Sequence, residues 1–573
     1  MVMRNRSAAA ITVAAIVASC VGLLEARPQG KGRPRAAAPW QADNGDGTYS
    51  NPVIFADYSD PDAIRVGDDF YLTASSFNCV PGLPILHSRD LVNWTIIGHA
   101  LPIQPPAAVF CKPQHGGGVW APALRHHQGH FYIFYGDPDF GVYMVKAKDP
   151  AGPWTEPHLL QAARGWIDPC PFWDDDGNAY LVRAWARSRS GIQSIITLHR
   201  LSPDGTRLLD TGVTVFDGRA HHPTIEGPKL YKRGGYYYIF APAGGVRAGW
   251  QTVLRSKNIL GPYLDRIVLD QGRTEINGPH QGAWVELASG ESWFVHFQDR
   301  GPYGRVTHLQ PLKWVDDWPV IGADPDGDGK GEPVLRHRQP VVGTSGRGQK
   351  PRGSPGGMPH FAAPQTGDEF NGPRLSRAWQ WHANPDPGWS SFTARRGWLK
   401  LLATPLPEGA ANLWSAANLL LQKLPGPAFT ATTRIDFSRL APGSRAGLLM
   451  MGADYSYIAA QRTAEGVRVI RGTATAAERG TPESLVPGAS LTGRVLFLRI
   501  TVREGARCDF AFSRDGRDFQ PLGEEFVARE GRWIGAKVGL FASRRGGQPG
   551  IPAHSGAEFD WFRLEKAGGK LLE

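Results

Sequence analysis

Five short segments of the chain repeat one pattern, a turn rich in Gly or Asp followed by a strand rich in aromatic residues. The segments are residues 67–72, 129–134, 177–182, 234–239 and 290–295. Their turn glycines stand about 50–60 residues apart, close to the period of one β-propeller blade. A second pattern, in which a strand end, a polar turn and an aromatic residue follow one another, repeats in residues 87–94, 146–154 and 255–263. The repeats therefore predict a propeller of five blades.

Side chains that can carry chemistry stand about one strand length ahead of each turn. They are Asp60, Trp120, Asp168, Glu226 and His280. The first strand of each propeller blade lines the central channel, so residues at the same phase of each repeat converge at one mouth of that channel. The pattern predicts one pocket that holds three carboxylates, an indole and an imidazole.

The whole chain is too long for one ordinary domain, since it has 573 residues. Its 70 glycines and 47 prolines are typical of an all-β protein with many tight turns. After the propeller, short alternating segments such as residues 429–435 and 495–500 are separated by turn signals, which predicts a β-sandwich of jelly-roll type. The predicted division is a signal segment at 1–26, a propeller at 36–340, a linker at 341–364 and a sandwich at 365–573.

The N-terminus reads as a targeting segment. Arg4 and Arg6 precede an apolar run that ends at Cys20 and is too short to span a bilayer, as in a secretory signal. Residues 17–20 resemble a bacterial lipobox, which predicts a lipid anchor at Cys20, and plain secretion with cleavage near Ala26 is the alternative. Whether the segment is a lipoprotein signal or a plain secretory signal, it predicts an exported protein.

Export permits disulfides, and Cys79 with Cys111 is the pair we expect, with buried free thiols as the open alternative. The net charge of +10 lies largely in residues 27–35 and 347–352, which predicts solvated charge and no nucleic-acid site. Residues 324–329 match the start of a calcium loop, but the last ligand position would be Leu335, so we interpret them as a structural turn.

Three carboxyl groups at one channel mouth point to glycosidic bond hydrolysis. That reaction needs a proton donor at the leaving oxygen and a second carboxylate on the opposite face of the sugar. A third carboxylate raises the pKa of the donor by like-charge repulsion. We expect the Trp120 and Phe77 side chains to form sides of the sugar-binding pocket, with core packing as the alternative for Trp120. His280 is either a hydrogen-bonded core histidine or the ligand of an ion that neutralises the carboxylates.

The motifs around these residues resemble glycoside hydrolase family 43 over residues 45–340. The matching motifs, in order, are residues 51–77, 119–122, 167–169 and 225–228. One departure is Ser59, which stands where the family commonly has proline before the aspartate, and we expect only a small effect on the loop. The invertases, a five-bladed family with a retaining mechanism, fit less well because the chain lacks their Asn-Asp-Pro-Asn motif.

The resemblance implies a five-bladed, inverting enzyme that acts on β-D-xylosides, α-L-arabinofuranosides or arabinans. It implies Asp60 as general base, Glu226 as general acid and Asp168 as the group that modulates the pKa of the acid and orients it. It further implies that Arg305 contacts the sugar and the modulator, and that His280 lies near a structural calcium ion, with no cofactor required for the reaction. The C-terminal region resembles the concanavalin A-like sandwich of family β-xylosidases, which leans over the pocket.

The predicted function is therefore an exported exo-glycosidase that removes terminal β-D-xylosyl or α-L-arabinofuranosyl units from hemicellulose fragments. Two alternatives belong to other classes. A non-catalytic carbohydrate-binding propeller would have lost one of the three carboxylates, and all three are present. A protein-interaction propeller would need no acidic groups at the channel mouth.

Overall fold

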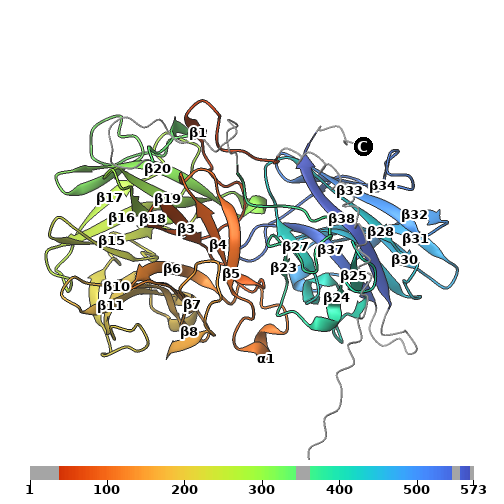
Figure 1. Cartoon of the computed structure of the whole chain (residues 1–573), viewed down its shortest axis with the longest axis horizontal. Helices are drawn as coiled ribbons and strands as arrows, with labels where there is room; N and C mark the ends of the chain where they lie inside the picture. The colour runs from red at the N-terminus through yellow and green to blue at the C-terminus, as the bar shows by residue number, and fades with distance from the viewer. Residues whose placement is uncertain (1–37, 343–361, 545–554, 568–573) are drawn as a thin grey trace, which may run out of the picture. The chain divides into compact units, whose positions relative to one another are not determined.

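The computed structural model describes residues 38–342, 362–544 and 555–567 (Figure 1). The predicted all-β class and the five-bladed propeller with its sandwich are confirmed. Five four-stranded antiparallel sheets follow one another along the chain, and two eight-stranded sheets come after them. The described residues hold two α-helices, α1 (Ala107–Phe110) and α2 (Arg187–Ser190), each of four residues. None of the described helices has the length and apolar character needed to cross a bilayer.

Each blade takes four consecutive strands, paired in chain order. Blade 1 is β2 (Asp62–Val66), β3 (Asp69–Thr73), β4 (Gly82–Ser88) and β5 (Thr95–Leu101). Blade 2 is β6 (Trp120–His127), β7 (His130–Asp137), β8 (Gly141–Ala147) and β9 (His158–Ala162). Blade 3 is β10 (Trp166–Trp173), β11 (Ala179–Trp185), β12 (Ile195–Leu201) and β13 (Val213–Asp217). Blade 4 is β14 (Lys229–Arg233), β15 (Tyr236–Ala243), β16 (Trp250–Ser256) and β17 (Leu264–Leu269), and blade 5 is β18 (His280–Glu286), β19 (Ser292–Asp299), β20 (Arg305–Val315) and β21 (Trp318–Ile321).

The repeated turns join the first strand of each blade to the second. Their glycines, at positions 67, 129, 177, 234 and 290, all have φ between 57° and 84°. A side chain is strained in that left-handed region, and glycine enters it freely, so the turn repeats because its backbone geometry repeats. The aromatic residues after each turn form the second strands, which lie between two neighbours in their sheets.

The ring closes between blade 5 and blade 1 mainly by side-chain burial. Trp293 and Leu309 of blade 5 share one buried cluster with Phe70, Leu72 and Trp94 of blade 1. No strand is exchanged between these two blades, because each keeps its own four. A short entry strand, β1 (Thr48–Ser50), pairs with β22 (Arg336–Arg338) beyond blade 5 and adds backbone hydrogen bonds to the closure.

The C-terminal region forms two stacked sheets. One has the order β23-β27-β37-β29-β30-β31-β32, with β26 as an eighth strand beside β37. The other has the order β24-β25-β38-β28-β33-β34-β35, with β36 as an eighth strand beside β34. Their strands are β23 (Gln380–Trp381), β24 (Ser390–Ser391), β25 (Leu399–Leu402), β26 (Thr404–Pro405), β27 (Leu420–Lys423), β28 (Phe429–Asp436), β29 (Ser444–Met451), β30 (Tyr455–Arg462), β31 (Val467–Ala474), β32 (Ser484–Leu491), β33 (Val495–Arg503), β34 (Arg507–Ser513), β35 (Gln520–Pro521), β36 (Phe526–Val527), β37 (Lys537–Arg544) and β38 (Gly556–Lys566). Ile435, Leu498 and Leu540 are among the apolar residues buried in the sandwich core, and Phe55 and Tyr303 of the propeller belong to the same cluster. The sandwich core therefore continues into the propeller.

Some predictions about the termini and loops concern residues outside the described ranges, and the predicted disulfide is wrong. The signal segment with Cys20, and most of the predicted linker at 341–364, lie outside them. The expected Cys79–Cys111 disulfide is wrong, because both residues are free thiols. The Sγ atom of Cys79 is buried 2.9 Å from the Nζ atom of Lys537, whereas Cys111 is exposed at the end of α1. Asp324 accepts backbone N–H bonds from Gly327 and Gly329, as a structural turn requires.

Replacing Trp293 by alanine tests how the ring closes. The indole is fully buried between blade 1 and blade 5, so we expect Trp293→Ala to lower the free energy of unfolding by about 3–5 kcal/mol. Denaturant unfolding followed by tryptophan fluorescence and circular dichroism measures this loss. Leu260→Ala, at a side chain that is 56% exposed, is the control and should change stability by less than about 0.5 kcal/mol. Equal effects of the two variants would contradict closure by this cluster.

Candidate active site

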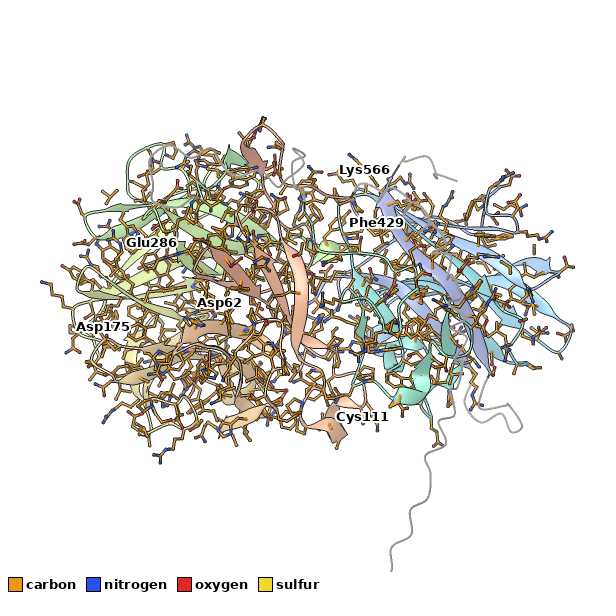
Figure 2. The ribbon with its side chains drawn as sticks, viewed as in Figure 1. Asp62, Cys111, Asp175, Glu286, Phe429 and Lys566 are labelled. Atoms are coloured by element: carbon orange, nitrogen blue, oxygen red, sulfur yellow. The ribbon has the colours of Figure 1, made fainter. Side chains whose placement is uncertain are left out.

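One cavity of about 330 Å³ collects the predicted catalytic residues. Asp60, Asp168 and Glu226 line it, together with Trp120, Phe77 and Arg305 from the predicted substrate-binding set. They come from the starts of the innermost strands and from the adjoining loops. Asp62, labelled in Figure 2, begins the innermost strand of blade 1 just after Asp60. Residues up to 245 positions apart in the sequence thus meet at one end of the channel.

The backbone turns in the same way at the start of every innermost strand. Strands β6, β10 and β18 each show a pairing irregularity there, and Ala121, Asp168 and Gln281 inside it have φ of 32°, 56° and 36°. Asp60 (53°) and Gly227 (57°) occupy the equivalent places just ahead of β2 and β14. Such bulges re-aim a side chain and leave the extra residue unpaired. The repeated bulge is what brings side chains to the channel mouth.

This geometry corrects the expectation of a single shared phase. In four blades a proline follows the left-handed residue, namely Pro61, Pro122, Pro169 and Pro228. Asp60 and Asp168 therefore share one phase, and Glu226 stands one residue earlier, in the phase of Trp120 and His280. Successive residues both reach the cavity because the bulge interrupts the alternation of the strand. The proline that follows each of these left-handed residues is visible in the sequence, and aligning the blades on it would have shown that Glu226 stands one residue earlier than Asp60 and Asp168.

Asp60 is buried and held by three donors. The hydroxyls of Ser59 and Ser75 lie 2.8 and 2.6 Å from its Oδ2 atom, and Arg305 donates from Nη1 to Oδ1 at 3.0 Å. The same Nη1 donates to the Oγ atom of Ser59 at 2.8 Å. An ionised carboxylate can accept all these bonds, so its orientation is fixed. The predicted contact of Arg305 with Asp168 is replaced by bonds to Asp60 and Ser59.

Sequence reasoning missed the part played by Ser59. We expected its departure from the family's proline to have little effect, yet its hydroxyl joins Asp60 to Arg305. A hydroxyl can donate one hydrogen bond and accept others, which proline cannot do with its side chain. The signal was the departure itself, next to a candidate catalytic carboxylate.

Asp168 is 2% exposed and accepts a hydrogen bond from the backbone N–H of Gly227 at 2.8 Å. Burial, followed by the negative charges of Glu226 and Asp60, raises the pKa of Asp168 well above its usual range. The Gly227 N–H bond and the Lys229 ammonium oppose this rise without cancelling it. Glu226 is the charged group that contributes most to this rise, so the carboxyls of Asp168 and Glu226 act on each other electrostatically.

His280 stands directly against Glu226. Its Nε2 atom lies 3.0 Å from the Oε1 atom of Glu226, its ring packs edge-on to Phe297, and its side chain is fully buried. Calcium favours oxygen ligands, and in the described residues the one group of three close ligand atoms is Asp324, Asp326 and Asp328, without His280. The structure places His280 in contact with Glu226. A calcium ion near His280 stays a prediction.

The sandwich adds an aromatic wall that sequence reasoning did not name. Trp533 lies in the loop between β36 and β37 and lines the same cavity as Trp120, with ring centres 6.3 Å apart. The Trp120 indole donates to the carbonyl of Gly116 at 2.8 Å, which fixes its ring. The signal in the sequence was a tryptophan between two glycines, Gly531 and Gly535, in a turn that follows several charged residues.

Comparison with known proteins gives the family. The model "Glycosyl hydrolases family 43" matches residues 49–319, and "Beta xylosidase C-terminal Concanavalin A-like domain" matches residues 367–565. A curated protein of Xylanibacter ruminicola is 42% identical over 504 residues, which cover 87% of each chain. The chain belongs to glycosyl hydrolase family 43. It is thus a glycoside hydrolase, and the predicted recognition is confirmed.

Further family 43 proteins match nearly the whole chain. A "Beta-xylosidase" of Formosa agariphila is 32% identical over 575 residues, with 92% of each chain covered. Among solved structures, a GH43 protein from Bacillus licheniformis superposes with a TM-score of 0.75 at 27% identity, over 91% of this chain and 100% of the other. The xylan beta-1,4-xylosidase from Bacillus halodurans gives 0.76 at 25%, over 90% and 100%. The two-part architecture is therefore shared with these two solved structures.

Replacing Asp168 by asparagine should stabilise this family 43 enzyme in a pH-dependent way. The pKa of Asp168 is raised in the folded state, so its contribution to stability is complete at acid pH and is lost as the pH rises. We expect Asp168→Asn to match the wild-type Tm near pH 4 or below, and to exceed it increasingly toward pH 8. Asparagine can still accept the Gly227 bond through its amide oxygen. Calorimetric scans across this range measure the difference, and a gain that is independent of pH would contradict the assignment.

Proposed function

We propose that the chain is an inverting exo-glycosidase that releases terminal β-D-xylosyl or α-L-arabinofuranosyl units from hemicellulose fragments. The observation that carries this proposal is the placement of Asp60, Asp168 and Glu226 on one cavity in three different surroundings. Relatives support the substrate class, since one is named "Beta-xylosidase" and another, from Bacteroides ovatus at 30% identity, "Non-reducing end alpha-L-arabinofuranosidase".

Asp60 fits the general base. Ser59, Ser75 and Arg305 fix its carboxylate, which accepts a proton as a water molecule attacks the anomeric carbon. The bond from that carbon to the leaving oxygen breaks on the opposite face of the sugar. The attack and the bond cleavage occur in one displacement, which inverts the anomeric configuration.

Glu226 fits the general acid, with Asp168 and His280 as its positioning partners. In this proposal a proton passes from the Glu226 carboxyl to the leaving oxygen, so that an alcohol departs. His280 at 3.0 Å keeps the Glu226 carboxyl from rotating away. Asp168 interacts with Glu226 electrostatically, because the negative charge of Glu226 helps to raise the pKa of Asp168.

The aromatic walls suit a small sugar ring. Trp120, Phe77 and Trp533 enclose a cavity of about 330 Å³, at the small end of ligand sites. Aromatic faces pack on the C–H surfaces of sugars, and both candidate pentoses lack the hydroxymethyl group of a hexose. The cavity shape thus supports a terminal pentose, and a comparison of the two aryl pentosides decides between xylose and arabinose.

Conservative removal of either catalytic carboxylate should abolish turnover. We expect Glu226→Gln and Asp60→Asn each to lower kcat on aryl pentosides by about 10²–10⁴-fold, because each loses one proton-transfer step. Both variants should keep the wild-type circular dichroism spectrum. Asp175→Asn, at a side chain that is 87% exposed, is the matched control and should keep full activity. A near-normal rate in either catalytic variant would refute the roles of acid and base assigned to Glu226 and Asp60.

The stereochemistry and the substrate can be read in one experiment. Proton NMR of the first minutes of hydrolysis should show an anomeric product of configuration opposite to the substrate. We expect turnover of aryl β-D-xyloside, aryl α-L-arabinofuranoside or both, and comparison of the two kcat/KM values decides the preferred pentose. Retention of configuration would exclude the inverting mechanism, and no hydrolysis of either compound would favour the carbohydrate-binding alternative.

We also propose export, with or without a lipid anchor at Cys20. The support is the sequence pattern of residues 1–26 alone. Metabolic labelling with a fatty-acid analogue tests the anchor, and Cys20→Ser is the control that should remove the label.

A further inference from the structure

A buried lysine that the proposed reaction does not use lies close to the catalytic carboxyls. Lys229 begins β14, shortly after Glu226 in the sequence, and it is 1% exposed. Its Nζ atom donates to the carbonyl of Pro122 at 2.9 Å and lies 3.9 Å from the Oδ2 atom of Asp62. Burying an ammonium group is unfavourable unless negative charges or hydrogen bonds compensate for it, so the groups around Lys229 decide what its charge can do.

Asp62 already has a closer cation than Lys229. Its Oδ2 atom accepts from the Nη1 atom of Arg125 at 2.7 Å and from the backbone N–H of Leu124 at 2.7 Å. The Asp62 side chain, labelled in Figure 2, is fully buried, and the Arg125 side chain is 13% exposed. Two largely buried cations therefore lie near one carboxylate, and one positive charge is left uncompensated. Lys229, the more distant of the two from Asp62, carries this charge.

Arg125 is directed toward Asp62 and away from the role of a second counter-charge. Besides its bond to Asp62, its Nη2 atom lies 2.9 Å from the Sγ atom of Cys170. In the described part of the chain, the hydrogen-bond acceptor of the Lys229 ammonium is the carbonyl of Pro122, which is neutral. The charge of Lys229 can therefore act on another carboxylate nearby.

Asp168 is the carboxylate on which Lys229 acts. Burial contributes most to the raised pKa of Asp168, the negative charges of Glu226 and Asp60 add to it, and the positive charge of Lys229 opposes it. Gly227, which lies between Glu226 and Lys229 in the sequence, donates its N–H to Asp168 at 2.8 Å. One short segment thus supplies the proposed proton donor, a hydrogen bond to Asp168 and a positive charge that acts on Asp168.

The charge of Asp168 matters for the proton donor. The other two carboxyls contact Arg305 and His280, so Lys229 is the cation that remains for Asp168. An ionised Asp168 makes the loss of the Glu226 proton less favourable, because two negative charges would then lie close together. A protonated Asp168 has no such effect. A cation that favours ionised Asp168 therefore helps Glu226 to keep the proton that it passes to the leaving oxygen.

We infer that Lys229 is a positioning residue of the reaction, a buried counter-charge that favours the ionised form of Asp168 and thereby keeps the proton on Glu226. Lys229 is not among the residues that line the catalytic cavity, so it acts through Asp168 and not on the sugar. This inference rests on the proposed function and deepens it, because it adds a group that controls the acid.

The first test compares two aryl pentosides that differ in their need for an acid. A phenyl pentoside has a poor leaving group that requires protonation, whereas a 2,4-dinitrophenyl pentoside has a good leaving group that departs without it. Lys229→Met keeps the length of the side chain and removes its charge. We expect it to lower kcat/KM about tenfold on the phenyl compound, the effect of about one pKa unit, and less than about twofold on the dinitrophenyl compound. A purely structural role of Lys229 would lower both constants equally.

Two further variants calibrate this comparison. Glu226→Gln removes the proposed acid and should show the same selective loss on the phenyl compound, to a larger extent. Tyr231→Phe is the matched control, because its ring lies 5.4 Å from the Arg125 guanidinium and the change removes no charge from this part of the channel. It should leave the ratio of the two constants unchanged. A selective loss in Glu226→Gln together with equal losses in Lys229→Met would overturn the inference.

The second test measures stability, so that it does not depend on turnover. Asp168→Asn should raise the Tm increasingly as the pH rises, because the pKa of Asp168 is raised in the folded protein. This gain should level off once the pH exceeds that pKa. In Lys229→Met the pKa of Asp168 should be higher still, so the gain should continue to rise to higher pH and end larger. Calorimetric scans of the four proteins from pH 4 to 9 measure both gains, which should coincide near pH 4.

The two tests separate the inference from the proposed function. The same gain from Asp168→Asn in both backgrounds at every pH would overturn the electrostatic contact between Lys229 and Asp168. If Glu226→Gln lowers both rate constants equally while the two gains still differ at high pH, the proposed acid fails and Lys229 stands as the counter-charge of Asp168.

Discussion

A left-handed residue at the start of each innermost strand makes the rest of this site possible. A regular strand sends alternate side chains to opposite faces, so only every second residue could reach the channel mouth. The bulge at Asp168, and the equivalent turn at Asp60, break this alternation and let neighbouring residues face the same cavity. A non-glycine residue held at positive φ costs on the order of 1–3 kcal/mol, so the surrounding structure must impose it. The three hydroxyl and guanidinium bonds to Asp60, and the Gly227 bond to Asp168, are part of that surrounding structure.

Three carboxyls that line one cavity repel one another, and the fold gives each of them a different partner or environment. Asp60 is paired with a guanidinium at 3.0 Å, Glu226 faces the His280 imidazole, and Asp168 keeps a raised pKa. These differences give the three carboxyls unlike surroundings, as the proposed division into a base and an acid requires. Deeper in the channel, buried Asp62 is matched by Arg125 at 2.7 Å, so its charge adds little to the repulsion.

The repeats and the carboxylates could be predicted because both depend on local sequence. A turn glycine and an aromatic strand recur with the blade, and Asp60, Asp168 and Glu226 recur with the innermost strand. The one-residue difference in phase between Glu226 and the two aspartates was missed, because periodicity alone does not reveal a bulge. The proline that follows the left-handed residue marks the bulge in the sequence. Trp533 was missed for a different reason. Its contact with Trp120 joins residues more than 400 positions apart, one in the propeller and one in the sandwich, and no spacing rule reports such a contact.

Asp57 explains why the sandwich belongs to the site as well as to the fold. Its buried carboxylate accepts from the backbone N–H of Arg305 on one oxygen and from that of Gly535 on the other, both at 2.9 Å. Arg305 binds Asp60, and Gly535 follows Trp533 in the same loop, so one carboxylate connects the arginine that binds Asp60 to the aromatic wall of the cavity. Without the sandwich, one oxygen of Asp57 would lose its donor, and Phe55 and Tyr303 would lose the apolar cluster that buries them. The catalytic end of the propeller is therefore completed by residues that the second domain supplies.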